Sequence, residues 1–373
     1  MLHPFDDLPL HQGPDPLLHL SSDSPGLYDR YFHNGHDANG RIFFGVALGV
    51  YPNRRVMDAS FSVVVDGVQH SVRASRQCDR DRTTTTVGPI ELTVVQPMLE
   101  HRLRVNPRLG VGCDLTWRAT SAVVEEPIFR RVVDGRPTFA YTRITQFGRW
   151  SGWIEVDGAR IDLADLGRVD GCRDRSWGMR NAAKGIAGPH EHRQFFWQWA
   201  PTTFDDLCTH LAVNEDEEGR SWHRSGAITA RSGDGITDVA AVLDESRVVR
   251  ATEVHVDVVW EPGTRWLRRA TVVLETWRSE PLEVVYEPVM RFQMNGIGYL
   301  HPEWDHGAWK GAAAETRDSS VVADVDPADR SMLHVQQLCR ATSGDRVGVA
   351  AFEVLAIGPH IPSGLTGVSD GSR

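Results

Sequence analysis

Short alternating segments joined by two-residue Asp-Gly turns are the feature that most constrains the fold of this chain. Residues 61–65 and 68–72 flank Asp66-Gly67, and residues 153–156 and 159–163 flank Asp157-Gly158. Asp-Gly between two alternating apolar stretches is the strongest short-range signal of a β-hairpin. Residues 111–118 alternate strictly between apolar and other residues. No stretch of the first half keeps a helical period, so the sequence predicts strands there.

The second half has the same texture and predicts a second set of strands. Residues 254–260 alternate, turn at 261–264 and continue through 271–277, and further strands are expected near 285–294, 331–340 and 347–355. Many short strands separated by turns are typical of sandwiches and barrels. We therefore predict an all-β protein of two tandem antiparallel barrel or sandwich domains with little helix. The expected division is an irregular segment at 1–26, domains at 27–190 and 191–361, and a disordered tail at 362–373.

Charge and cysteine usage exclude several classes of function. The formal net charge of −10 argues against nucleic acid as the main partner. The five cysteines form no CxxC pair, so neither a zinc ribbon nor a disulfide framework is indicated. The longest apolar run, residues 42–51, is about half as long as a membrane span requires, and the first residues lack the pattern of a signal peptide. We expect a reduced, cytoplasmic compartment and no transmembrane segment.

The familiar motifs of nucleotide binding and hydrolysis are missing. The sequence has no GxxxxGK[ST], no GxSxG, no HExxH and no GxGxxG between a predicted strand and a predicted helix. We therefore expect no cofactor, and any chemistry has to come from other clusters of side chains.

The first such cluster is Gly-Cys-Arg-Asp-Arg-Ser-Trp-Gly-Met-Arg at residues 171–180. Its glycines favour a tight bend or a close backbone approach over a regular element. Asp174 lies between Arg173 and Arg175, and we expect its carboxyl to be ionised if the two guanidiniums fold back onto it. Asp174 is then either a catalytic residue or a structural ion-pair partner that fixes the bend.

Residues 194–200 predict a strand with an aromatic face. Phe195, Trp197 and Trp199 alternate with two glutamines, so the three rings point one way. Such a face most often packs in a core. The closeness of Asp174 and Trp177 in the sequence favours an apolar cavity instead.

The second cluster is Gly-Ile-Gly-Tyr-Leu-His-Pro-Glu-Trp-Asp-His-Gly at residues 296–307. His301, Glu303 and Asp305 share one face if this stretch is extended, with His306 adjacent. Two histidines and a carboxylate suit a metal triad of the non-haem iron type. An acid–base pair without metal, with either histidine as base and either carboxyl as acid, fits equally well. A polar loop that caps a barrel mouth is the third interpretation.

The first cluster also carries a resemblance to a known family. Asp-Arg-Ser-Trp-Gly at residues 174–178 resembles the Asp-His-Asn-(Trp/Tyr)-Gly motif of the hydroxyneurosporene synthase (carotenoid 1,2-hydratase) and AttH-like superfamily, and residues 146–152, 194–197 and 296–307 add to the likeness. Members of that superfamily are built from two lipocalin-like β units, so the resemblance implies the same fold here. This chain has Arg175-Ser176 where the relatives carry His-Asn, so an acid role of that histidine cannot be transferred.

These residues favour acid–base chemistry on an apolar molecule. Hydrating or isomerising an alkene requires a proton donor in a dry pocket, and aromatic faces stabilise a cationic intermediate by about 0.5–2 kcal/mol each. We expect the two halves to close around an apolar cavity that holds a hydrophobic, isoprenoid-like or polycyclic ligand, and to act as a hydratase, dehydratase, isomerase or cyclase. The expected catalytic residues are Asp174, His301 and Asp305. The expected substrate-binding residues are Arg175, Trp177, Trp197, Trp199, Tyr299, Glu303, Trp304 and His306.

Two other classes of function fit the same residues. One is a non-catalytic carrier of hydrophobic ligands, because β-barrels often bind without reacting. The other is a metal-dependent oxygenase that uses His301, Glu303, Asp305 and His306, although no metal is expected under the leading hypothesis. The sequence leaves open whether the chain forms a homodimer.

Overall fold

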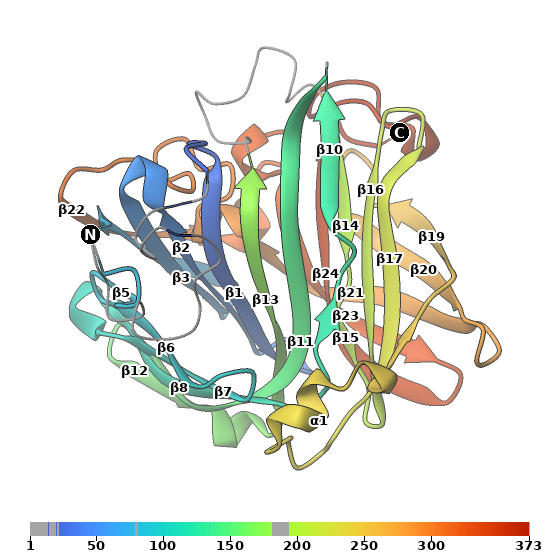
Figure 1. Ribbon diagram of the computed structural model, residues 1–373, viewed down its shortest axis with the longest axis horizontal. Coiled ribbons are helices and arrows are strands. Elements are labelled where there is room, and N and C mark those ends of the chain that lie inside the picture. The colour runs from blue at the N-terminus through green and yellow to red at the C-terminus, as the bar shows by residue number, and fades with distance from the viewer. Residues whose placement is uncertain are drawn as a thin grey trace.

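Two curled antiparallel β-sheets make up the part of the chain that the computed structural model describes, namely residues 14, 20, 22–78, 81–133, 135–180 and 194–372. In Figure 1 the first sheet (mostly blue to green) lies to the left and the second (mostly yellow to red) to the right, and β11 and β13 of the first sheet and β14 of the second are in the middle of the view. The predicted fold class, all-β with two lipocalin-like units and little helix, is confirmed. The segment predicted at 1–26 and the boundary predicted near residue 190 fall almost wholly outside the described residues.

The first sheet contains 14 strands in the described residues, and its main path runs β22-β4-β3-β2-β1-β13-β11-β8-β7-β6-β5. Short strands β9, β10 and β12 pair with the long β11. The bounds are β1 Leu27–Asp37, β2 Ile42–Tyr51, β3 Val56–Val65, β4 Val68–Gln77, β5 Thr86–Val87, β6 Ile90–Gln96, β7 Glu100–Val105, β8 Val111–Ala119, β9 Val124–Glu125, β10 Phe129–Val133, β11 Arg136–Val156, β12 Ala159–Asp162, β13 Val169–Arg180 and β22 Ala313–Val321.

The second sheet contains 10 strands on the same basis, in the order β18-β17-β16-β14-β24-β23-β21-β20-β19, with β15 against β16 and β24. The bounds are β14 Phe195–Trp199, β15 Thr202–Thr203, β16 Leu207–Glu215, β17 Ser221–Ala230, β18 Val248–Arg250, β19 Glu253–Trp260, β20 Leu267–Glu275, β21 Leu282–Gln293, β23 His334–Ser343 and β24 Arg346–Ile357.

Helical structure is limited to single turns. The described residues contain the α-helix α1 Val239–Leu243 and the 3₁₀ turns η2 Pro52–Arg54, η3 Pro107–Leu109, η4 Leu163–Leu166, η5 Glu245–Arg247, η6 Met294–Ile297, η7 Val322–Asp324, η8 Arg330–Met332 and η9 Ile361–Ser363. None of the helices in this described part could span a membrane.

Both Asp-Gly hairpins form as the sequence predicts. Asp66 and Gly67 have φ values of 50° and 76°, and Asp157 and Gly158 have 50° and 85°. Two successive residues with positive φ match the twist of antiparallel strands, and Asp-Gly adopts this conformation readily. The turns fix the register of β3 against β4 and of β11 against β12.

Two segments differ from the simple tandem division. Strand β22 comes late in the chain, yet it pairs with β4 of the first sheet over its whole length. It thereby covers an edge that would otherwise expose unpaired backbone groups. The tail after residue 361, predicted to be disordered, packs against the second sheet through residue 372, because the buried Arg265 guanidinium donates to the carbonyls of Gly367 and Asp370.

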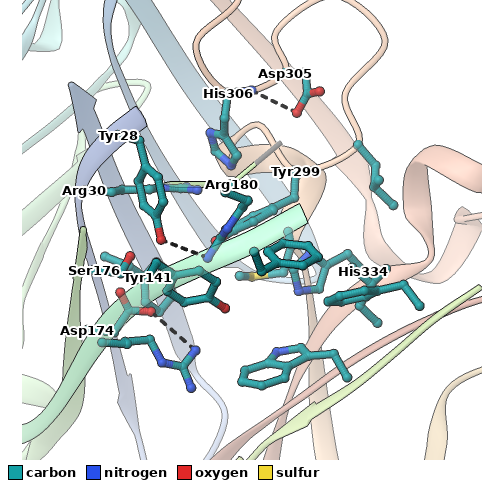
Figure 2. Close-up of a pocket in the computed structure, with 18 of the residues that line it drawn as sticks. Tyr28, Arg30, Tyr141, Asp174, Ser176, Arg180, Tyr299, Asp305, His306 and His334 are labelled. Carbon is teal, nitrogen blue, oxygen red and sulfur yellow. Dashed lines mark hydrogen bonds and ion pairs between the residues drawn. The ribbon is translucent and has the colours of Figure 1, made fainter. Parts of the chain in front are cut away.

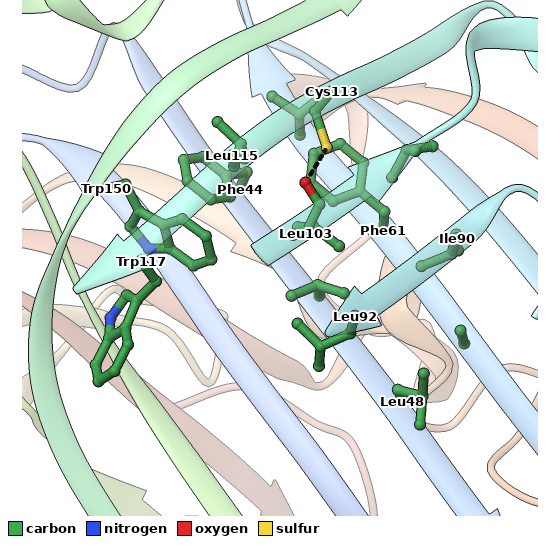
Figure 3. Packing of buried hydrophobic residues seen from close by; sticks show 14 of the residues in the cluster. Phe44, Leu48, Phe61, Ile90, Leu92, Leu103, Cys113, Leu115, Trp117 and Trp150 are labelled. Atoms are coloured by element: carbon green, nitrogen blue, oxygen red, sulfur yellow. Dashed lines mark hydrogen bonds between the residues drawn. The ribbon is translucent and has the colours of Figure 1, made fainter. Parts of the chain in front are cut away.

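Three large apolar clusters and a small fourth one, made of Ala122, Val124, Ala227 and Val248, stabilise the described sheets. One fills the concave side of the first sheet and includes Phe44, Phe61 and Trp150 (Figure 3). A second lies within the second sheet. The third joins the two sheets through residues such as Phe32 and Trp197, and it is here that the structure leaves a cavity.

Candidate active site

A cavity between the two sheets is lined by side chains from both. The cavity has a volume of about 180 Å³ and opens partly to solvent. One wall comes from β1, β11 and β13, the opposite wall from β14, β23 and β24, and the roof from the loop after η6 (Figure 2). The aromatic and aliphatic lining includes Phe32, Phe139, Phe195, Trp197, Leu355 and Ile357.

The first wall is formed by side chains on three adjacent strands, β1, β13 and β11. Gly178 of β13 lies opposite Tyr28 of β1 and Tyr141 of β11. An added Cβ on Gly178 would meet the Ala140 carbonyl oxygen at 2.5 Å, and its φ is 137°. Glycine therefore allows the strands to approach closely here, and the two phenol rings lie 6.0 Å apart across it.

Asp174 lies on the cavity face of β13, within a regular strand rather than a bend. The predicted bend is wrong, and the predicted close approach is right, because a Cβ on Gly171 would collide with the Asn34 carbonyl. Strand alternation turns Arg173 and Arg175 to the opposite face. There the Arg173 guanidinium donates to the Gln146 Oε1 atom at 2.9 Å, and Arg175 pairs with Asp29.

The nearest described guanidinium to the Asp174 carboxyl is therefore that of Arg143, with Nη1 and Oδ2 3.9 Å apart. The Asp174 side chain is only 13% exposed. Burial raises its pKa to about 6, and the positive charges of Arg143 and Arg30 limit this increase. The condition for an ordinary ionised carboxylate, that Arg173 and Arg175 fold back onto it, is not met, and a pKa of about 6 suits the group to donate a proton near neutral pH.

Arg143 is held by a buried carboxylate behind the wall. Its Nε and Nη2 atoms each donate to Glu126 at 2.7 Å, and Thr145 also donates to Glu126 at 2.8 Å. Burial would raise the pKa of Glu126, but the charges of Arg143 and His210 outweigh burial and lower it. This bidentate pair holds the Nε and Nη2 atoms, and the remaining Nη1 atom lies 3.9 Å from the Asp174 carboxyl, which is too far for a hydrogen bond.

The opposite wall carries a histidine–carboxylate pair, His334 of β23 and Glu353 of β24. The His334 Nε2 atom lies 2.8 Å from the Glu353 Oε1 atom. The Trp197 indole and the Gln336 amide also donate to Glu353, at 2.8 and 2.6 Å. Burial would raise the pKa of Glu353, but these donors and His334 outweigh it and lower the pKa.

The other ring nitrogen of His334, Nδ1, is buried and has no hydrogen-bond partner among the residues that the structure describes. When Nε2–H donates to Glu353, Nδ1 keeps a free lone pair. The carboxylate thus fixes the tautomer of a histidine at the cavity, which is the arrangement of a general base.

Tyr299 and His306 form the roof. The edges of His306 and His334 meet the Tyr299 ring with centroids 4.4 and 4.5 Å away, and the Arg30 guanidinium lies 4.5 Å from its centre (Figure 2). Burial and the charges of Arg30 and Arg180 hold the pKa of His306 well below its usual value, so its ring is neutral. The Asp305 carboxyl accepts from the His306 backbone N–H at 2.9 Å.

The loop is anchored to the first sheet, which places the second sequence cluster over the cavity. The Gly307 N–H donates to Asp58 at 2.6 Å, and the Arg54 guanidinium donates to the His306 carbonyl at 3.1 Å. Burial raises the pKa of Asp58 to about 6.

The structure brings together about half of the residues predicted for the site. Asp174, Trp197, Tyr299, Asp305 and His306 line the cavity. Trp199 is buried behind the wall, 6.1 Å from the Phe32 ring. The remaining predicted residues, Arg175, Trp177, His301, Glu303 and Trp304, do not line it.

The residues outside the cavity have other surroundings. Trp177 is 42% exposed on the far face of β13. His301 caps a turn, because its Nδ1 atom accepts from the backbone N–H groups of Glu303 and Trp304 at 3.1 and 3.0 Å. Residues 298–307 form successive turns, so the extended conformation that would place His301, Glu303 and Asp305 on one face is absent from this stretch. Glu303 is exposed and faces Lys310, which also lies over the Trp304 ring.

These turns separate the four groups of the predicted metal cluster. No three His, Cys, Asp or Glu side chains gather to hold a metal ion anywhere in the described part of the chain. The geometry of His301, Glu303, Asp305 and His306 thus gives the oxygenase alternative no assembled ligand set.

Sequence reasoning missed the histidine–carboxylate pair and the arginines. One signal was available: Glu353 is the only charged residue in the apolar stretch 347–357, which is typical of a buried and satisfied carboxylate. Arg30, Arg143 and Arg180 had no such signal, because ordinary surface arginines also alternate along strands.

Comparison with known proteins agrees with this architecture. A family model covers residues 2–366, nearly the whole chain, and its description is a family of unknown function, DUF8625. The chain belongs to this family. No curated protein matches its sequence significantly.

Three solved structures share the fold of this DUF8625 protein. An AttH-like protein (NE1406) of Nitrosomonas europaea aligns with a TM-score of 0.53 and 11% identity over 88% of this chain and 92% of that one. Kievitone hydratase of Nectria haematococca gives 0.52 and 10% over 88% and 89%. CghA, solved with Sch210972, gives 0.52 and 11% over 90% and 89%. The resemblance to the AttH-like superfamily is thereby confirmed for the fold.

Proposed function

We propose that this DUF8625 protein is an acid–base lyase or isomerase that hydrates, dehydrates, isomerises or cyclises a hydrophobic small molecule in the cavity. One observation carries the proposal. Asp174, whose pKa is raised to about 6, and the His334–Glu353 pair face the same cavity from opposite sheets. A buried carboxyl with a raised pKa suits the role of acid, and a histidine oriented by a carboxylate suits the role of base.

Hydration of an alkene illustrates the division of work. The Asp174 carboxyl gives its proton to one alkene carbon, and a water molecule adds to the other carbon while its proton passes to His334 Nδ1. The product is an alcohol, and proton transfer through solvent from His334 to Asp174 restores the enzyme. The Trp197 and Tyr299 rings would stabilise a cationic carbon by about 0.5–2 kcal/mol each. Dehydration is the reverse, and isomerisation uses the same two proton transfers without water.

The comparisons support this class of reaction without naming the substrate. One of the structures that share the fold is by its name a hydratase, and another was solved with Sch210972. For the substrate of this chain, the proposal depends on the cavity lining. Its aromatic side chains suit a ring-containing or isoprenoid-like molecule. Asp305 stays a candidate for a further proton-transfer role at the roof, where its carboxyl accepts from the His306 backbone.

The test follows solvent hydrogen into the ligand. Purified protein is incubated in D₂O with a panel of hydrophobic alkenes, enones and alcohols, and products are measured by mass spectrometry. We expect at least one compound to gain carbon-bound deuterium or to gain or lose one water. Asp174→Asn and Glu353→Gln should each abolish this exchange, while Asp29→Asn, on the far face of β1, should leave it intact.

Two outcomes would contradict the proposal. If compounds bind in the cavity and none exchanges hydrogen or changes mass, the protein is a carrier. If exchange occurs and survives in both Asp174→Asn and Glu353→Gln, the acid and base lie elsewhere.

A further inference from the structure

Two guanidiniums in the cavity wall, that of the buried Arg30 and that of the partly buried Arg180, have no carboxylate within 4.0 Å among the described residues. The Arg30 side chain is 3% exposed, and its Nε and Nη2 atoms have no hydrogen-bond partner in the described part of the chain. The Nε atom of Arg180 is buried in the same way, and within the described ranges its Nη2 atom donates to the Tyr28 hydroxyl alone, at 3.3 Å. Among the described residues no carboxylate oxygen comes within 4.0 Å of either group, whereas Arg143 has Glu126 at 2.7 Å.

The two arginines converge on one place. Arg30 lies over the Tyr299 ring, and Arg180 lies over the Tyr28 and Tyr141 rings at 5.1 and 4.7 Å (Figure 2). Their positive charges repel each other. Asp174 attracts both and Asp58 attracts Arg30, but the guanidinium within 4.0 Å of Asp174 is that of Arg143, at 3.9 Å.

A buried charge without a partner is costly, and aromatic faces offset only part of this cost. The usual reason to keep such groups is a ligand that pairs with them. Guanidinium groups bind carboxylates through paired N–H donors, and the protonated phenols of Tyr28 and Tyr141 can add donors. Burial keeps the pKa of both phenols above its usual value.

We propose that the cavity binds a hydrophobic carboxylic acid, with its carboxylate between Arg30 and Arg180 and its apolar body against Phe195, Trp197 and Leu355. This inference rests on the proposed function in one respect, that the same cavity holds the substrate, and it names the substrate class. A phosphate is the competing anion. Phosphate sites usually add backbone N–H groups of a helix N-terminus or glycine-rich loop, and this wall consists of side chains on strands.

The experiment measures binding and needs no turnover. Isothermal titration calorimetry compares 4-phenylbutyrate, its neutral amide and 3-phenylpropyl phosphate on the full-length protein. We expect the acid to bind about tenfold tighter than the amide. Arg30→Met and Arg180→Met should each abolish this preference while keeping the affinity for the amide. Arg175→Met, which removes a guanidinium from the far face of β13, is the matched control and should keep the preference.

Each other outcome overturns the inference. These outcomes are equal affinity for acid and amide, binding of neither, tighter binding of the phosphate, or a preference that survives in both cavity variants. Arg30→Lys and Arg180→Lys keep the positive charge and should retain part of the preference for the acid. Thermal unfolding of every variant verifies that it is folded. Failure of the proposed function is distinguishable, because a protein that prefers the acid and never exchanges deuterium supports this inference and refutes catalysis.

Discussion

Removing the carboxyl of Asp174 should stabilise the protein above about pH 6 and have little such effect below about pH 4. Burial raises the pKa of Asp174 from its ordinary 3.8 to about 6. The folded protein therefore favours the protonated carboxyl, and its contribution to stability is present below the ordinary pKa and lost as the pH rises to about 6. At about 1.36 kcal/mol for each pH unit between the two pKa values, the loss is about 3 kcal/mol.

Asp174→Asn is neutral at every pH, so its advantage over the wild type should grow by about 3 kcal/mol between about pH 4 and pH 7 and then level off. Urea unfolding followed by tryptophan fluorescence measures the difference at each pH. Asp114→Asn is the control of opposite sign, because hydrogen bonds from Arg102 lower the pKa of Asp114. This variant should be less stable than the wild type near neutrality, by an amount that shrinks as the pH falls through the folded pKa. An Asp174→Asn advantage that is flat or declines with pH would refute the assignment of a buried, destabilised carboxylate.

Three further predictions follow from the packing. Glu353→Gln replaces a carboxylate that accepts from three donors, so the free energy of unfolding should fall by about 2–4 kcal/mol in urea titrations. The control Glu287→Gln, on the exposed side of β21, should change it by less than about 0.5 kcal/mol. Equal effects would contradict the hydrogen-bond network around Glu353. Gly178→Ala should cost more stability than Gly158→Ala, because both have positive φ but only Gly178 meets a backbone carbonyl; the same thermal shift for both contradicts the close approach. No disulfide joins the five cysteines of the described chain, and all five are buried. Ellman's reagent should therefore label native protein only as fast as it unfolds, and one rapidly labelled thiol would contradict this burial.

The fold was largely predictable because its signals are local. Alternation and the turns at Asp66-Gly67 and Asp157-Gly158 act over a few residues, and each forms as expected. The place of β22 was not predictable in this way, since pairing with β4 depends on a contact distant in sequence.

The site was only partly predictable. Glycine at 171 indicated either a bend or a close approach, and only the regular strand shows the alternation that places Asp174 on one face and Arg173 and Arg175 on the other. With those two guanidiniums on the opposite face, burial is the largest influence on the Asp174 pKa and raises it. His301 was selected over His334 because it lies in a polar cluster, although the partner that makes a histidine a base, Glu353, comes from a neighbouring strand.

A crystal structure of the protein with bound 4-phenylbutyrate tests the central claim most directly. The account predicts density for the ligand in the cavity between the sheets, its carboxylate in hydrogen-bond contact with Arg30 and Arg180, and its chain passing between Asp174 and His334. Ligand bound only on an outer surface, with side chains from the two sheets closing the space between them, would contradict it.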